Sequence, residues 1–133
     1  MTGFDADEAK VQWCDLVNTY HRVSCALESE LGEKHGLGLS DYSVLDMLGG
    51  ACGVAGEKIP MKRIQEKLYL SQSAFSRAVT RLEKQGAVSR AACSTDRRSV
   101  FLTITPDGSR RLEEAAPTFK AVLESTLPEG RPA

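Results

Sequence analysis

The stretch STDRRS, residues 94–99, places one carboxylate directly before two guanidinium groups. It separates two runs of strand-like composition, 87–93 and 99–105, and this order is typical of a two-stranded hairpin. Ser, Thr and Asp are frequent in exposed turns, so an ordinary solvated turn is one explanation. The alternative is an anion-binding tip, in which Arg97 and Arg98 meet a polyanion and Asp96 orients one of them by a charge-assisted hydrogen bond.

A second group of polar side chains lies on a helix predicted just before this hairpin. Ser71 is a good N-cap for it, and Gly86 is a typical residue to end it. Helical spacing puts four apolar residues on one inward face: Phe75, Ala78, Val79 and Leu82. The remaining faces carry Gln72, Ser73, Ser76, Arg77, Thr80 and Arg81. Such side chains hydrogen-bond base edges and phosphates, although a solvated helix face has a similar composition.

Charge is distributed unevenly along the chain. Residues 58–98 contain ten Lys or Arg and three acidic residues, while the rest contains seven Lys or Arg and fifteen acidic residues. The net charge of −1 therefore conceals a basic middle between acidic ends. A basic segment that coincides with the predicted helix and hairpin indicates a surface that binds a polyanion such as DNA.

Further helices are predicted on both sides of this segment. Residues 7–31 form a long helix with one apolar stripe: Trp13, Leu16, Val17, Tyr20, Val23, Leu27 and Leu31. Ser40 is expected to cap a short helix that stops at Gly49 and Gly50, and residues 51–60 have the composition of a loop. Another short helix, 61–68, comes next.

The last helix is predicted over residues 106–127. Thr105 is its expected cap, and Pro106 suits its first position. Pro117 lies inside it and should kink it or remove a hydrogen bond. The tail, residues 128–133, is expected to be disordered.

This array resembles the MarR family of bacterial transcriptional regulators. The resemblance is carried by LSQSAFSRAVTRLEKQGAVSR, 70–90, and DRRSVFLTITPDG, 96–108, and it extends over about residues 39–108. It implies a mainly α single domain, 1–133, with a small β-hairpin wing. Residues 39–105 would form the winged helix-turn-helix, flanked by dimerisation helices at 7–36 and 106–127.

The resemblance also implies partners and roles. Asp96 and Arg98 match the family's wing signature, whose arginine enters the minor groove, and the partner would be a palindromic double-stranded DNA operator bound by a homodimer. A small aromatic or phenolic effector is implied, with Trp13, Tyr20, Tyr42 and Tyr69 as possible lining residues; the ligand-binding residues are unknown. Relatives often carry a further helix after the point where this chain stops, so a smaller or rearranged dimer interface is expected.

Other function classes find little support in the sequence. There is no Gly-rich phosphate loop, GxSxG or HExxH motif, so neither catalytic residues nor a cofactor are expected. No apolar run approaches the roughly 20 residues of a transmembrane helix, and the acidic N-terminus lacks a signal core. Four widely spaced cysteines without a CxxC motif favour a cytoplasmic protein with reduced thiols.

One flank of the first helix carries Cys14, His21 and Cys25, with Glu28 nearby. Thiolate and imidazole can bind soft metals, and a thiol beside a histidine can be redox-sensitive. Cys14 and Cys25 lie three helical turns apart, roughly 16 Å, which is too far for one tetrahedral ion, so no metal site is predicted. Packing of small apolar cysteines against another helix is the simpler explanation.

We therefore expect a dimeric DNA-binding transcriptional regulator, a repressor released by a small molecule. One alternative is a thiol-redox or metal-sensing regulator on the same fold. Another is a winged-helix module that binds protein rather than DNA.

Overall fold

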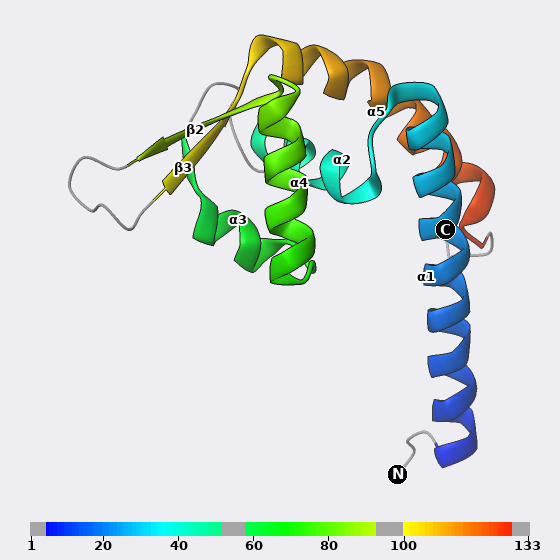
Figure 1. Cartoon of the computed structure of the whole chain (residues 1–133). Helices are drawn as coiled ribbons and strands as arrows, with labels where there is room; N and C mark the ends of the chain where they lie inside the picture. The colour runs from blue at the N-terminus through cyan, green and yellow to red at the C-terminus, as the bar shows by residue number, and fades with distance from the viewer. Residues whose placement is uncertain (1–4, 52–57, 93–99, 129–133) are drawn as a thin grey trace.

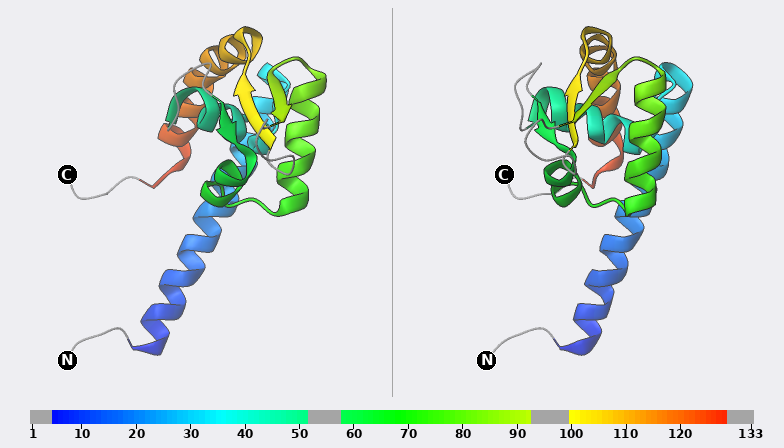
Figure 2. Two further views of the ribbon diagram at one scale, coloured as in Figure 1. Left: turned by 90° about the vertical axis from the view of Figure 1, so that its left-hand side faces the viewer. Right: turned by 60° about the vertical axis from the view of Figure 1, so that its left-hand side comes forward.

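The computed structural model describes residues 5–51, 58–92 and 100–128 of the chain. In these residues, four α-helices and a small sheet form a lobe, and a fifth, long helix packs into the lobe at one end and extends away from it (Figures 1 and 2). The predicted wing residues Asp96, Arg97 and Arg98 lie outside the described residues, as does the predicted tail from residue 129. Among the described residues, no helix is both long and apolar enough to cross a bilayer.

The extending helix is α1, Ala6–His35. Asp5 caps it by accepting a hydrogen bond from the Glu8 backbone N–H, and Gly36 ends it in the left-handed conformation (φ 66°). Its C-terminal half packs into the lobe, whereas its N-terminal half projects away from it (Figure 1). The predicted apolar stripe is consequently divided into a buried set, Val23, Leu27 and Leu31, and an exposed set, Trp13, Leu16, Val17 and Tyr20.

Helix α2, Leu39–Asp46, begins one residue before the predicted cap. The prediction of Ser40 as N-cap was wrong, because Gly38 holds that position and the Asp41 carboxylate accepts a hydrogen bond from its backbone N–H at 2.8 Å. Gly49 does not end the helix either, since a π-helical turn, Met47–Ala51, continues it. Gly49 instead allows close packing: a Cβ there would lie 2.9 Å from side-chain carbons of Ile104 and Leu112.

The helix-turn-helix consists of α3, Met61–Lys67, and α4, Gln72–Lys84. The predicted hairpin is confirmed as β2, Val88–Ala92, and β3, Val100–Ile104, paired antiparallel. The prediction of 51–60 as a loop missed a third strand, β1, Ile59–Pro60, which pairs with β3 and gives the sheet order β1-β3-β2. A two-residue strand is too short to show an alternating apolar pattern, and it forms only because it pairs with β3.

The last helix, α5, Pro106–Thr126, packs along α1. Thr105 caps it as predicted, because its hydroxyl accepts a hydrogen bond from the Gly108 backbone N–H at 3.0 Å. Pro117 lies inside the helix. The ribbon of α5 changes direction part-way along its length (Figure 1), which is the kink expected of an internal proline.

Gly108 in the first turn of α5 allows a close approach to a neighbouring backbone that the sequence did not reveal. A Cβ there would lie 2.0 Å from the carbonyl oxygen of Ala87 and 2.8 Å from Ile104 Cγ1. We expect Gly108→Ala to lower the free energy of unfolding by about 1–3 kcal/mol, the usual cost of overpacking, in urea denaturation.

Gly32→Ala is the matched control, because a Cβ at this exposed position of α1 meets nothing within 4 Å. Alanine favours helix over glycine, so this variant should be more stable than the parent by about 0.5–1 kcal/mol. Equal midpoints for the two variants would contradict the close approach at Gly108.

Candidate nucleic-acid interface

Helix α4 presents the predicted polar set on its surface. Its apolar face is buried as predicted, at Phe75, Ala78, Val79 and Leu82. Ser71 caps the helix by accepting a hydrogen bond from the Ala74 backbone N–H at 3.1 Å, and Gly86 follows it with a φ of 76°. All six predicted residues are exposed: Gln72, Ser73, Ser76, Arg77, Thr80 and Arg81. The burial of one face thus leaves the other free to meet a ligand.

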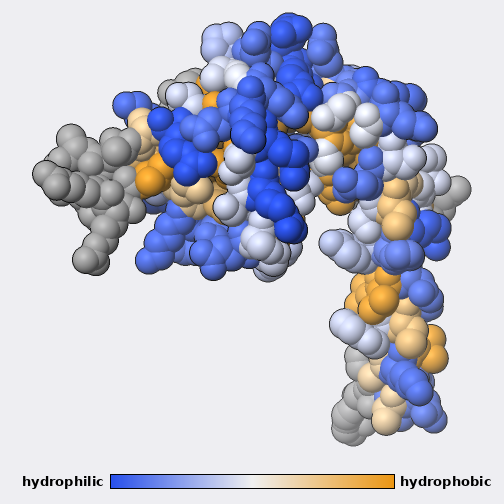
Figure 3. Space-filling model, viewed as in Figure 1, coloured by the Kyte–Doolittle hydropathy of each residue, from blue (hydrophilic) through white to orange (hydrophobic). Residues whose placement is uncertain are grey.

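The surface around α4 is hydrophilic and basic. Figure 3 shows hydrophilic residues covering this helix on the viewed face of the lobe. Residues 58–92 carry eight Lys or Arg and only two acidic residues, Glu66 and Glu83. Helix α3 adds three exposed cations beside the start of α4: Lys62, Arg63 and Lys67. A helix lying in the major groove would meet phosphates on both sides, and this charge suits them.

The polar side chains of α4 differ in their freedom to bind. The Thr80 hydroxyl donates to the Ser76 carbonyl oxygen at 3.0 Å, so its hydrogen is used within the helix. The side chains of Gln72 and Arg77 form no hydrogen bond or ion pair with any other residue in the part of the chain that the structure describes. These two long side chains are therefore the best placed to reach a base edge.

Arg81 is engaged elsewhere. Its guanidinium donates to Asp41 Oδ1 from Nε at 3.1 Å and from Nη2 at 2.8 Å, while its side chain is 47% exposed. Asp41 is only 3% exposed, and the same carboxylate caps α2. Arg81 thus joins α4 to the start of α2, and its contact with DNA remains a prediction. The Gly38–Asp41 spacing was the one sequence signal for this carboxylate.

The wing lies beside α4 (Figure 1), and its base is joined to that helix. Arg90 of β2 forms an ion pair with Glu83 at 3.2 Å. The roles of Asp96, Arg97 and Arg98 remain predictions, because these residues are not among those described.

The structure does not bring together the four aromatic residues considered for an effector cleft. Tyr42 is buried and stacks on Phe119, with ring centroids 4.4 Å apart, whereas Trp13, Tyr20 and Tyr69 are exposed. Burial, and secondly the negative charge of Asp46, raises the pKa of the Tyr42 hydroxyl above its ordinary value. Its place is in the core between α2 and α5.

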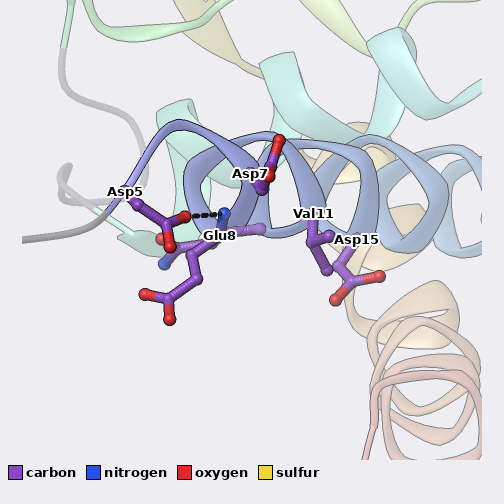
Figure 4. Close-up of a pocket in the computed structure, with 6 residues that line it drawn as sticks. Asp5, Asp7, Glu8, Val11 and Asp15 are labelled. Atoms are coloured by element: carbon purple, nitrogen blue, oxygen red, sulfur yellow. Dashed lines mark hydrogen bonds between the residues drawn. The ribbon is translucent and has the colours of Figure 1, made fainter.

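Hollows occur elsewhere on the surface. One of about 470 Å³ lies where α1, α2 and α4 meet, lined by Glu28, Gly32, Gly36, Leu37, Gly38, Asp41 and Arg81. Another lies at the start of α1 and is lined mainly by acidic side chains, including Asp5, Asp7, Glu8 and Asp15 (Figure 4). Because a single helix lines the second hollow, it encloses little of any ligand.

The thiol and imidazole groups of α1 form a pair rather than a cluster. Cys14 and Cys25 are exposed, and Cys25 Sγ lies 3.7 Å from His21 Nε2. Glu28 is occupied, since its carboxylate accepts a hydrogen bond from the Leu39 backbone N–H at 3.1 Å. Within the described ranges, no three His, Cys, Asp or Glu side chains lie close enough together to hold a metal ion.

Comparison with known proteins agrees with this geometry. Residues 35–99 match the model of the MarR family. The chain is also 30% identical over 112 residues to the HTH-type transcriptional regulator MhqR of Bacillus subtilis, covering 84% of this chain and 73% of the relative. The chain belongs to the MarR family. This MarR-family protein is a DNA-binding transcriptional regulator, as the sequence predicted.

Solved structures confirm the winged-helix fold of this MarR-family protein. The transcriptional regulator BldR from Sulfolobus solfataricus is 26% identical, with a TM-score of 0.79 over 96% of this chain and 88% of that one. Sco3205 of Streptomyces coelicolor, a MarR-family regulator solved in complex with DNA, has a TM-score of 0.79 at 24% identity, covering 95% of this chain and 76% of that one.

The two arginines of α4 should differ in their effect on stability. Arg81→Ala leaves the buried Asp41 carboxylate, within the described residues, with the Gly38 backbone N–H as its remaining donor. We expect this variant to lose about 1–3 kcal/mol of unfolding free energy, the cost of an unsatisfied buried acceptor. The exposed Arg77→Ala should lose less than about 0.5 kcal/mol. Urea denaturation of both variants tests this, and coincident curves would mean that the Asp41–Arg81 pair contributes nothing.

Proposed function

We propose that this MarR-family protein is a homodimeric repressor that reads a palindromic operator with α4 and leaves it when a small organic ligand binds. The observation that carries the proposal is the two-sided character of α4. One face is fixed in the core, and the other presents six polar side chains within a basic segment. The proposal includes no catalytic activity, and a regulator of chromosomal DNA acts in the cytoplasm.

In this proposal, the side chains of Gln72 and Arg77 on α4 recognise the bases. Arg pairs best with guanine and Gln with adenine, so Arg77 and Gln72 would contact base edges in the major groove. The serine and threonine hydroxyls, together with the α3 cations, suit phosphates. Arg98 would enter the adjacent minor groove, where a narrow groove concentrates negative potential.

Arg77→Ala tests the DNA face without disturbing the fold. We expect weaker operator binding and a loss of about 1–3 kcal/mol of discrimination at the base that Arg77 contacts. Operator fragments selected from random DNA by the parent, then titrated by fluorescence anisotropy at several salt concentrations, give both quantities.

Lys120→Ala serves as the control, because it removes one exposed cation from α5, away from α4. It should bind the operator as the parent does. Parent-like affinity and specificity in Arg77→Ala would exclude this helix face as the reading surface. Binding that did not weaken with salt would favour the protein-interaction alternative.

The proposed dimer uses the projecting half of α1. Five apolar side chains there are from 43% to 72% exposed: Val11, Trp13, Leu16, Val17 and Tyr20. Figure 3 shows hydrophobic patches on this half of the helix. Large apolar side chains gathered on a helix that projects into solvent indicate an interface. A palindromic site needs two recognition helices about one turn of the DNA apart, so a second copy of this chain is the fitting partner.

Leu16→Glu should disrupt this dimer, because it buries an unpaired charge in the interface. We expect a monomer in sedimentation at micromolar concentration and a loss of operator binding, with the lobe still folded. Gln12→Glu adds the same charge on the same helix, at a position outside the apolar set, and should remain dimeric. A dimeric Leu16→Glu protein would place the interface elsewhere.

The stimulus is proposed to be an organic ligand rather than thiol oxidation or a metal. The contact between Cys25 and His21 favours the thiol alternative enough to merit a direct comparison. We expect a Cys14→Ser/Cys25→Ser variant to bind and release the operator like the parent when either is treated with organic peroxide or zinc. Release of the parent alone, with the variant retained on DNA, would establish the sensor alternative.

A further inference from the structure

Arg111 of α5 joins the ends of two other helices. Its Nη2 donates to the backbone carbonyl oxygens of His35, at 3.0 Å, and Gly36, at 3.5 Å, where α1 ends. Its Nη1 donates to the side-chain oxygen of Gln85, the C-cap residue of α4. One half-buried guanidinium therefore contacts the ends of both α1 and α4.

The chemistry of this junction suits arginine in particular. The last carbonyls of a helix lack partners within it and carry the negative end of the helix dipole, so a cation stabilises them. A guanidinium is planar and holds its five N–H donors in a fixed fork, so Nη1 and Nη2 can bind two helix ends at a set distance. Gly36 lies within this contact, since a Cβ there would be 3.8 Å from Arg111 Nη2.

The surrounding contacts show why this one side chain matters. His35 Nε2 lies 2.8 Å from Thr118 Oγ1, which joins α1 to α5 but does not reach α4. The Asp41–Arg81 pair joins α4 to α2 but does not reach the end of α1. In the described parts of the chain, Arg111 is the side chain whose hydrogen bonds reach the ends of both α1 and α4.

We propose that Arg111, acting through Gln85, is a positioning residue that fixes the separation of the two α4 helices in the dimer. This inference rests on the proposed function, because only a dimer has two such helices. A small rotation of the lobe about the end of α1 would displace α4, which stands apart from the projecting half of α1 (Figure 1). Loosening the junction should therefore relax the preferred half-site spacing of the operator.

The experiment measures affinity as a function of half-site spacing. The operator selected by the parent is remade with its centre shortened or lengthened by one or two base pairs, and each probe is titrated by fluorescence anisotropy. For Gln85→Ala and Arg111→Ala we expect the discrimination between the best and the altered spacings to shrink about tenfold, equivalent to about 1.4 kcal/mol. Gln85→Ala leaves the contacts of Arg111 with α1 in place, so it should remain folded and dimeric.

Two further variants separate positioning from a general loss of stability. Gln85→Glu retains an acceptor for Arg111 and should keep the parental spacing preference. Arg110→Ala removes a neighbouring cation whose ion pair, with Asp107, stays within α5, and it should also behave as the parent.

The outcomes distinguish the inference from the proposed function. Parental discrimination in Gln85→Ala and Arg111→Ala, or equal weakening of every probe, would overturn the inference alone. If the parent protein showed no preference for any half-site spacing, the proposal that a homodimer binds two half-sites would be wrong, and this inference would fail with it.

Discussion

The burial of the apolar face of α4 is the constraint on which the rest of the molecule depends. Phe75, Ala78, Val79 and Leu82 are all but inaccessible to solvent, and α4 packs against α2. Since consecutive helical residues are about 100° apart, fixing this face also fixes the directions of Gln72 and Arg77. One face of α4 thus stabilises the fold, and the opposite face is available for recognition.

Polar contacts set how that helix is held. They lie at helix ends, where backbone groups lack partners within their own helix. The first turn of α2 receives carboxylates from Asp41 and, across from α1, Glu28. The last turn of α1 receives the guanidinium of Arg111. Side-chain packing restricts the angles between helices, and these directed hydrogen bonds restrict them further.

Local signals allowed most of the fold to be predicted from the sequence. Some signals involve only neighbouring residues, such as the caps Ser71 and Thr105 and the helical spacing of α4. The sequence pattern alone is therefore enough to predict them. The errors have a different origin. Ser40 was predicted to cap α2, but Gly38 holds that position, because the Asp41 and Glu28 carboxylates accept hydrogen bonds from the first backbone N–H groups. Strand β1 depended on β3, more than forty residues later.

The candidate site was also predictable only where its features depend on neighbouring residues. Spacing indicated which side chains of α4 face outward, and all six are exposed. It could not reveal that Arg81 is paired, because its partner Asp41 is forty residues away in sequence. The stripe on α1 likewise indicated an apolar surface without indicating what covers it. Long-range pairing is the information that a local pattern lacks.

The uncovered half of α1 has a consequence for how such a regulator responds to its own abundance. Suppose that the two α4 helices are spaced correctly only after two chains associate. While monomers predominate, the concentration of the DNA-binding dimer then grows with the square of the chain concentration. Operator occupancy then rises more steeply than synthesis of the protein. A modest change in expression would be converted into a sharper change in transcription, with no ligand involved.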